Sequence, residues 1–481
     1  MELKKQVVRG VVWTMVDRGG SMAVQTLVSI LLARLLAPSA FGLISMLTVF
    51  SLVSNVFVEG GFTQALIRKE RPTPRDYTSV FWLNVAMGLF MYLLLCALAW
   101  PIARFYDQPE LVRIAPLLFL TLPVSSLWIT HQTVLTKRFD FRVIAKISIV
   151  SFIVSGGAAV WMAFAGWGAW ALAWQAVLMN ATKAVLFWCW NRWRPTAGFS
   201  MESLRELFGA SSRFFLTELI NQTFHNVSQM LVARFYSVTQ TGYYSQSRRL
   251  KDLPSASLSV AIMNVTFPAL SALQNDREKL REGSRKVIAV MAFLLYPVMV
   301  GMLVTAPELF AVVLTDKWMP AVPYFQIFCL TTLTLPLTNV LQNVLKVCGR
   351  TQLILNIEIV RKAFAALVIA VTLPVSVQAV IWGQLLYMTV DMAINMYYAS
   401  RLVEYRMTMQ LRDLAPVALL TFAMWAGVTA VGMLAAPVLT LGWLLTVKIT
   451  AGAAIYLGGA RLFRLAAWNE TYEIVRGLLG R

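Results

Sequence analysis

The stretch ARFYSVTQTGYYSQSRRLKDLP, from Ala233 to Pro254, decides the fold because an earlier part of the chain repeats it. Two hundred residues upstream, without a gap, four of its residues recur in the same order. The matching pairs are Ala33 and Ala233, Arg34 and Arg234, Gly42 and Gly242, and Ser45 and Ser245. The same register aligns polar residues of the preceding helix, which are Arg18, Ser21, Gln25 and Ser29 in the first copy and Glu218, Asn221, His225 and Gln229 in the second. This register predicts a tandem duplication.

A second repeated motif supports the duplication. Leu120-Thr121-Leu122-Pro123 recurs as Leu333-Thr334-Leu335-Pro336, at nearly the same offset. We therefore expect residues up to about 190 and from about 205 to 400 to be two copies of one six-helix unit, as in transporters built from parallel repeats.

The composition indicates an all-α polytopic membrane protein. Of the 481 residues, 58% are hydrophobic and 14% are charged, whereas soluble domains are about 25% charged. The mean hydropathy is +0.66. A membrane span needs about 20 apolar residues, and the chain divides into fourteen such stretches. Their bounds are 10–35, 41–67, 78–101, 111–135, 143–165, 168–190, 209–234, 242–270, 286–314, 322–346, 351–373, 375–399, 414–436 and 440–463.

The net charge of +19 is distributed by side of the membrane, which argues against a nucleic-acid partner. Loops rich in Lys and Arg alternate with loops that carry few of them, so the positive-inside rule places both termini in the cytoplasm. We expect residues 1–194 to form an N-terminal six-helix lobe, 195–212 a cytoplasmic linker, 213–402 a C-terminal six-helix lobe, and 403–481 two accessory helices and a cytoplasmic tail. The four cysteines show no metal or disulfide spacing and are interpreted as packing residues.

Polar side chains share one face of the second span. They are Thr48, Ser51, Asn55, Glu59 and Thr63. The span ends at Gly60-Gly61, where a helix can bend or backbones can approach closely. Hydrogen bonds between helices and a cavity both explain such a face. Because ionisable groups at depth more often line a cavity, Glu59 favours the second explanation.

The strongest polar signal lies in spans seven and eight. Span seven presents Glu218, Asn221, Gln222, His225 and Gln229 on one face, and span eight carries Arg248, Arg249, Lys251 and Asp252. Cations inside a membrane are costly unless they meet water, counter-ions or an anionic ligand, and Asp252 neutralises one of three. An anion-binding cavity is the favoured interpretation, and a satisfied ion-pair network is the alternative.

Further charges lie in spans eleven and twelve. Glu358 is three and four residues from Arg361 and Lys362, so these side chains are expected to pair locally. Asp391 shares a face of span twelve with Gln384, Tyr387 and Asn395.

Five stretches together resemble a known family. They are Gly242-Tyr243-Tyr244 with the run through Arg248 to Pro254, FPALSALQNDREKLR from Phe267 to Arg281, TDKWMPAVPYFQIF from Thr315 to Phe328, Trp82-Leu83-Asn84, and TKRFDF from Thr136 to Phe141. Their order and spacing resemble the Wzx-like lipid-linked oligosaccharide and polysaccharide flippases of the multidrug/oligosaccharidyl-lipid/polysaccharide (MOP) superfamily, nearest to the colanic-acid type. The resemblance covers nearly the whole chain.

This resemblance implies two six-helix lobes around a central cavity that opens to each side in turn. It implies that a polyprenyl-pyrophosphate-linked oligosaccharide is flipped to the periplasmic leaflet of the bacterial inner membrane for O-antigen, capsule or exopolysaccharide synthesis. The polysaccharide polymerase and the glycosyltransferases of the same pathway are the implied partners. Candidate substrate-binding residues are Arg18, Gln25, Asn221, Arg248, Arg249 and Lys251.

Proton coupling is expected from carboxylates at depth. The candidates are Glu218, His225, Glu59 and Asp391, and a permanent salt bridge from Glu218 to an arginine of the first lobe is the alternative. No nucleotide-binding loop, metal cluster or nucleophile with a histidine base occurs in the sequence, so we expect neither an enzyme nor a cofactor. A peptidoglycan-precursor flippase and a multidrug antiporter remain open. A polysaccharide polymerase or ligase fits less well, because the outward loops are short.

Overall fold

The computed structural model describes residues 2–196, 198–274, 276–349 and 351–471. Within these ranges the side chains of residues 2–12, 14–16, 18, 210, 256–269, 351, 352 and 355 are outside the description. Every regular element in the described ranges is a helix, which confirms the all-α class. Contacts divide the chain into two compact units, Met1–Ser245 and Gln246–Arg481, and the division falls inside α11 (Val238–Ala272).

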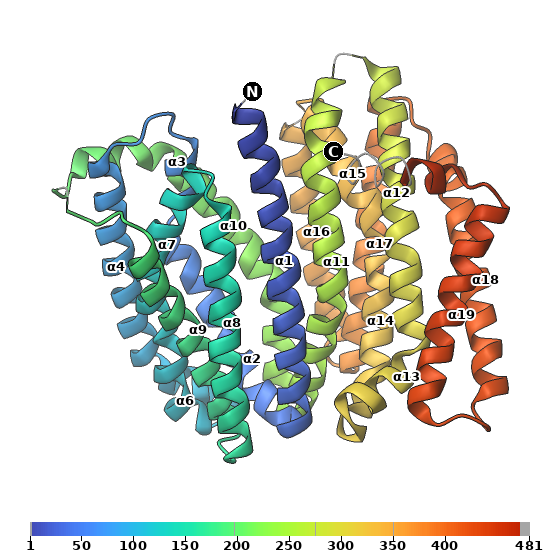
Figure 1. Cartoon of the computed structure of the whole chain (residues 1–481), viewed down its shortest axis with the longest axis horizontal. Helices are drawn as coiled ribbons and strands as arrows, with labels where there is room; N and C mark the ends of the chain where they lie inside the picture. Colours follow the sequence, from blue (N-terminus) through green and yellow to red (C-terminus); the bar gives the residue numbers. More distant parts are fainter. Residues whose placement is uncertain (1, 197, 275, 350, 472–481) are drawn as a thin grey trace. The chain divides into compact units, whose positions relative to one another are not determined.

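The first unit is built around α2 (Pro38–Glu59), which contacts α4, α6, α7, α9 and α10. The long helix α1 (Glu2–Leu35) packs on α8 (Figure 1). The other helices of this unit are α3 (Phe62–Arg68), α4 (Pro74–Ala97), α5 (Ala99–Tyr106), α6 (Glu110–Phe119), α7 (Thr121–Lys137), α8 (Phe141–Phe164), α9 (Ala169–Trp190) and α10 (Met201–Phe235).

The second unit packs around α12 (Arg277–Val304) and α17 (Val377–Leu402). The other elements that follow α11 are α13 (Ala306–Leu309), the π-helix Phe310–Leu314, the 3-10 helix Asp316–Ala321, α14 (Val322–Thr332), α15 (Leu335–Val347), α16 (Thr351–Thr372), α18 (Met407–Ala435) and α19 (Leu441–Leu462). The last two stand side by side, and buried Lys448 of α19 forms an ion pair with Glu308 of α13. This pair adds to the apolar packing of α18 and α19 against α12 in the core of the second unit.

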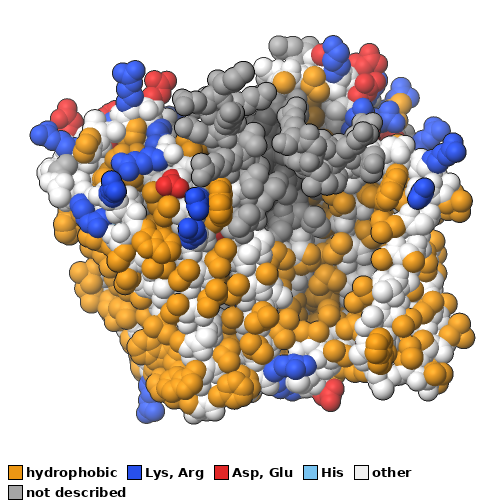
Figure 2. All heavy atoms as spheres, in the orientation of Figure 1, with side chains coloured by type: hydrophobic (Ala, Val, Ile, Leu, Met, Phe, Trp, Pro, Cys, Tyr) orange, Lys and Arg blue, Asp and Glu red, His pale blue; other side chains and the backbone are white. Residues whose placement is uncertain are grey.

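Nine helical segments of the described ranges are long and apolar enough to cross a membrane. In each unit, hydrophobic side chains cover the middle of the helices, while Lys and Arg gather near their ends (Figure 2). The chain is therefore a multi-pass membrane protein. The count of fourteen spans stays a prediction.

The joint between α1 and α2 has the same form as the joint between α10 and α11. In both, one helix ends and the next begins three residues later, from Leu35 to Pro38 and from Phe235 to Val238. Gly42 and Gly242 lie one turn into the second helices, and each packs against the other joint. A Cβ atom on Gly42 would lie 2.0 Å from the Val238 carbonyl oxygen, and a Cβ on Gly242 would lie 2.0 Å from that of Pro38. The repeat register thus corresponds to a reciprocal contact inside the first unit.

The repeated Leu-Thr-Leu-Pro motif marks a helix break in both copies. Thr121 Oγ1 donates a hydrogen bond to the Leu118 carbonyl across the junction of α6 and α7, at 2.7 Å. Thr334 Oγ1 donates to the Thr331 carbonyl before α15, at 2.9 Å. The stretches 111–135 and 322–346 therefore each contain two consecutive helices, because a proline that follows lacks a backbone N–H.

Two thirds of the stretch predicted as a linker, 195–212, is helical, because α10 covers residues 201–212. Helix α10 begins at Met201, after the Ser200 hydroxyl caps it by accepting a hydrogen bond from the Ser203 amide at 3.2 Å. Lys69 holds this end by ion pairs to Glu206 of α10 at 2.8 Å and Asp76 of α4 at 3.0 Å. The surface segment and the polar span thus form one continuous helix. The predicted lobe boundaries stay predictions.

Candidate functional site

A cavity of about 800 Å³ lies inside the first unit, between α2, α3, α7, α9 and α10. Four of the five polar residues predicted on the second span line it, namely Thr48, Ser51, Asn55 and Glu59. Their spacing of three or four residues places them on one side of α2. The cavity interpretation of this polar face is therefore confirmed for these four residues.

One hydrogen bond between helices also contributes to this face, since Ser125 Oγ of α7 donates to Asn55 Oδ1 at 3.4 Å. Within α2, Asn55 Nδ2 donates to the Ser51 carbonyl at 3.0 Å. The buried Ser51 hydroxyl has no hydrogen-bond partner in the described part of the chain. The wall from α2 thus offers a polar atom that the protein itself leaves unsatisfied.

The opposite wall comes from α7 and α9. Trp128 Nε1 donates to Asn180 Oδ1 at 3.2 Å, and both residues line the cavity. Lys183, one turn beyond Asn180, places its ammonium 4.9 Å from the centre of the Trp128 ring and interacts electrostatically with Asp17. Lys183 does not line the cavity. The Trp128 ring and the Asp17 carboxylate thus stabilise the Lys183 charge outside the cavity lining.

Helix α10 closes the cavity with Glu218 and Gln222. The helix approaches α3 closely at Gly61, where a Cβ atom would lie 2.3 Å from the Ser211 carbonyl oxygen. Gly61 also has φ +71°, so both consequences predicted for Gly60-Gly61, a bend and a close approach, are confirmed. The bend brings Glu59, at the end of α2, to the same cavity as Glu218.

The remaining site candidates of the first unit lie elsewhere. Gln25 is half-buried on α1, and Asn221 and His225 are exposed on α10; none of the three lines the cavity. Arg18 lies on α1, but its side chain lies outside the described residues. No ion pair reaches Glu218 among the described side chains, so its expected partner Arg18 is untested.

In the second unit, α11 presents the predicted cations around one carboxylate. Lys251 Nζ lies 2.6 Å from Asp252 Oδ1, and Arg248 Nε lies 4.0 Å from Asp252 Oδ2. Arg249 is half-buried and forms no ion pair within the described chain. Asp252 therefore lies between two of the three predicted cations, and the anion-binding interpretation of this cluster stays a prediction.

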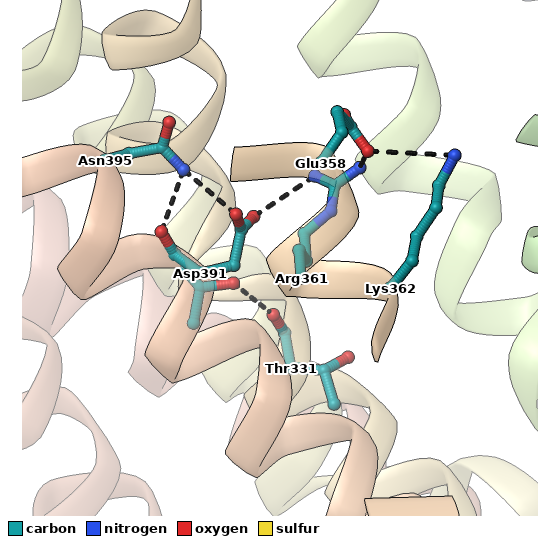
Figure 3. Close-up of polar contacts among 7 residues, drawn as sticks. Thr331, Glu358, Arg361, Lys362, Asp391 and Asn395 are labelled. Atoms are coloured by element: carbon teal, nitrogen blue, oxygen red, sulfur yellow. Dashed lines mark hydrogen bonds and ion pairs between the residues drawn. The ribbon is translucent and has the colours of Figure 1, made fainter. Parts of the chain in front are cut away.

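A second charged cluster joins α16 and α17 (Figure 3). Arg361 pairs with Glu358 on its own helix and reaches Asp391 Oδ2 of α17 at 3.4 Å. Lys362 lies 3.8 Å from Glu358, which confirms the expected local pairing. Asn395 Nδ2 donates to Asp391 Oδ1 at 3.0 Å. Asp391, with 7% of its side chain exposed, thus has one cationic and one amide partner.

Two of these contacts were missed from the sequence. The local spacing of Glu358 and Arg361 gave no sign of the bond between helices to Asp391. Lys183 was also missed, although a lysine in the middle of an apolar stretch is a signal for a functional or paired residue. Thr121, Ser125 and Trp128 follow one another at intervals of four and three residues, so the sequence also allowed the prediction that they share one helix face.

Among the described residues, no group of three His, Cys, Asp or Glu side chains is placed to bind a metal ion.

Helices that are long and apolar enough to span a membrane, together with a cavity of the first unit lined by carboxylate and amide groups, are typical of a membrane transport protein. The chain belongs to the family of polysaccharide biosynthesis proteins, whose profile matches residues 31–323.

Three relatives have names that describe their pathways. The teichuronic acid biosynthesis protein TuaB of Bacillus subtilis (strain 168) is 24% identical over 73% of both chains. The succinoglycan biosynthesis transport protein ExoT of Rhizobium meliloti (strain 1021) is 26% identical over 68% of this chain and 66% of its own. The lipopolysaccharide biosynthesis protein WzxC of Escherichia coli (strain K12) is 23% identical over 73% and 72%.

Solved structures establish the fold. The lipid II flippase MurJ, in an inward closed conformation, matches with a TM-score of 0.74 at 14% identity, over 95% of this chain and 98% of its own. An inward-facing multidrug resistance MATE family transporter of the MOP superfamily matches with a TM-score of 0.59 at 12% identity, over 83% and 98%. The family match thus confirms the resemblance to polysaccharide biosynthesis proteins, and the solved structures show that the chain shares its fold with MurJ and MATE transporters.

Proposed function

We propose that this protein flips a polyprenyl-diphosphate-linked oligosaccharide repeat unit from the cytoplasmic to the periplasmic leaflet of the bacterial inner membrane. Family membership supports the proposal, as do relatives named for the biosynthesis of teichuronic acid, succinoglycan and lipopolysaccharide. By the positive-inside rule, the distribution of basic loops supports termini that both lie in the cytoplasm. The pathway's polymerase and glycosyltransferases are the proposed partners.

The observation that carries the proposal is the excess of cations on α11. Arg248 and Lys251 lie within ion-pair distance of Asp252, and Arg249, beside them on α11, forms no ion pair among the described residues. A diphosphate cannot enter lipid without losing its hydration, and charge-assisted hydrogen bonds to guanidinium and ammonium groups replace that hydration. These three residues bind the diphosphate. Arg18, Gln25 and Asn221 are the candidates for further contacts.

Transport then needs no covalent step. The two units alternately expose the bound diphosphate and sugars to each side of the membrane, while the lipid tail stays in the bilayer. The polar groups at depth lower the free energy of the headgroup inside the membrane, and this lowers the barrier to crossing.

Proton coupling is proposed for Glu218, assisted by His225 on the same helix and by Glu59. The carboxylates of Glu59 and Glu218 line one cavity and repel each other when both are ionised. Asp391 is a weaker candidate, since Arg361 and Asn395 already stabilise its charge. In proteoliposomes, a Glu218→Gln variant should still flip substrate but should not respond to a pH gradient; an unchanged response excludes Glu218.

A peptidoglycan-precursor flippase is the second candidate, favoured by the high structural similarity to MurJ. The two candidates predict different accumulated lipids. When the protein is removed from its host, mass spectrometry should find a polyprenyl-diphosphate oligosaccharide repeat unit on the cytoplasmic leaflet. Accumulation of a peptide-bearing disaccharide precursor would establish the second candidate, and accumulation of neither would reject both.

A further inference from the structure

The second unit contains an apolar pocket of about 400 Å³ between α12, α14, α15, α17 and α18. Apart from Tyr296 and Thr334, its described lining consists of leucine, methionine and alanine side chains. The Thr334 hydroxyl already donates to the Thr331 carbonyl at 2.9 Å. A buried water needs about two to four hydrogen-bond partners, which this lining does not offer. The pocket is therefore suited to hydrocarbon and unsuited to water or to a sugar.

The pocket extends from the first turns of α18 to a helix break. Leu411 and Ala418 of α18 are exposed and mark its open side, while Leu333 and Thr334 lie at the break between α14 and α15. From Leu411 to Ala418 is two turns along one face of α18, a length of about 10 Å. Because α18 is long and apolar enough to span a membrane, this open side faces lipid tails. The opening thus matches an extended acyl chain that lies along α18.

Two arginines lie at the same end of α18 as Leu411. Arg406 precedes the helix and Arg412 lies in its second turn; both are exposed, and neither forms an ion pair with another described residue. Arg412 comes three residues before Ala415, which lines the pocket, so both lie on the same side of α18. The neighbouring Asp413 is occupied by Arg285, which donates to both of its oxygens at 2.7 Å. The two arginines are therefore available to an anion beside the pocket.

The charge at this end of the pocket is positive. Between the last turn of α17 and the second turn of α18, Arg401, Arg406 and Arg412 are balanced by Glu404 alone once Asp413 is counted with Arg285. Basic pockets between membrane helices bind anionic lipid headgroups, and charge-assisted hydrogen bonds from guanidinium to phosphate are strong. A ligand with one phosphate and a hydrocarbon chain complements both parts of this site.

We propose that this pocket binds one acyl chain of an anionic phospholipid of the surrounding membrane, whose phosphate contacts Arg406 and Arg412. A zwitterionic phospholipid carries an ammonium group that the same arginines repel, so it binds more weakly. The bound chain fills the space between α18 and the break of α14 and α15. The site lies entirely within the second unit and is independent of the proposed transport step.

Native mass spectrometry of the purified full chain tests the proposal. The protein is titrated with phosphatidylglycerol or phosphatidylethanolamine of identical acyl chains. We expect one saturable site that binds phosphatidylglycerol about tenfold more tightly, a difference of about 1.4 kcal/mol. The variant A415F fills the pocket and should lower the affinity for phosphatidylglycerol about tenfold. The variant R406Q/R412Q should bring the two lipids to equal affinity.

Matched controls separate the site from general attraction to lipid. A426F places the same ring at an exposed position of α18 outside the lining, and R461Q/R464Q removes two exposed arginines at the end of α19. Both should bind phosphatidylglycerol as the wild type does. R406Q/R412Q removes no ion pair within the described chain, so its folding should survive even if A415F fails to fold.

Several results would overturn the proposal. Equal affinity of the wild type for the two lipids, or a retained preference in R406Q/R412Q, would exclude the headgroup contact. Wild-type affinity in A415F would exclude the pocket, and a loss of binding in the controls as well would indicate non-specific attraction. If equimolar undecaprenyl phosphate displaces phosphatidylglycerol from the wild type, the pocket receives a polyprenyl chain and the phospholipid assignment fails.

Discussion

Gly42 and Gly242 occupy equivalent positions of the repeat and each lies against the backbone of the other copy's helix joint. Such a reciprocal contact is what a two-fold relation between duplicated segments produces where the segments meet.

Alanine at either glycine should disrupt this contact. G42A and G242A each place a Cβ atom 2.0 Å from a carbonyl oxygen, and only a backbone shift relieves the clash. Overpacking of this kind costs about 1–3 kcal/mol. Thermal unfolding in detergent should show a lower Tm for both variants. The matched control is G157A on α8, where the added methyl group meets nothing within 4 Å. Equal Tm values for G42A and G157A would contradict the contact.

The cations of α11 are expected to determine transport rather than stability. The variant R248Q/R249Q/K251Q should insert normally and lose most of its flipping rate, because neutral amides do not replace charge-assisted bonds to a diphosphate. Fluorescent lipid-diphosphate flipping in proteoliposomes measures the effect. The control changes two arginines and one lysine near the start of α12, in R277Q/K279Q/R281Q. A wild-type rate in the α11 variant would end the diphosphate-site proposal.

The bond between α16 and α17 predicts an order of stabilities. R361Q leaves the buried carboxylate of Asp391 without its cation, which costs about 3–5 kcal/mol. D391N should cost about 1–3 kcal/mol, since Arg361 keeps Glu358 as a partner. The exposed pair Arg281–Glu278 provides a control, because R281Q should cost about 0–1 kcal/mol. Thermal unfolding should rank the Tm losses in this order; a greater loss for D391N would refute it.

The Lys448–Glu308 pair predicts a non-additive double variant. K448M leaves Glu308 buried without its cation, and the expected cost is about 3–5 kcal/mol. K448M/E308M removes both charges and should be more stable than K448M alone. Unfolding monitored by limited proteolysis of α18 and α19 would test this. If the double variant is the less stable one, the pair is not what holds these helices.

Lys69 predicts an alkaline transition at the start of α10. Burial alone would lower the pKa of its ammonium, but hydrogen bonds to Glu206 and Asp76 outweigh burial and raise the pKa above its usual 10.5. A raised pKa means that the stabilisation is complete below pH 10.5 and is lost as pH rises through the higher folded value. A spin label on M201C should gain mobility between about pH 8 and pH 11.5. The K69M background should be mobile at both values; a transition that persists in it would exclude Lys69.

Local patterns predicted much of this molecule. The spacing of Thr48, Ser51, Asn55 and Glu59 was sufficient to predict a cavity wall, because residues three or four positions apart lie on the same face of a helix. The Gly60-Gly61 pair predicted the bend, because glycine adopts positive φ angles without steric cost. The repeat register predicted two equivalent joints, although their mutual contact depends on tertiary packing.

Contacts between helices were harder to predict. Arg361 has a partner on its own helix, so nothing in the sequence required Asp391 as a second one. The breaks beside Thr121 and Thr334 lie inside continuous apolar runs, where hydropathy carries no information about backbone hydrogen bonds. The helical start of α10 was expected to be a linker, because Pro195 and Gly198 resemble a domain boundary by composition.

Helix α10 has a mechanical consequence. Its 35 residues extend without interruption from the Lys69 clamp to the Gly42–Gly242 crossing, a rod of about 50 Å at 1.5 Å per residue. If α10 tilts as a rigid body about its Phe235 end, its Met201 end moves farthest, and Glu218, near the middle of the helix, moves about half as far.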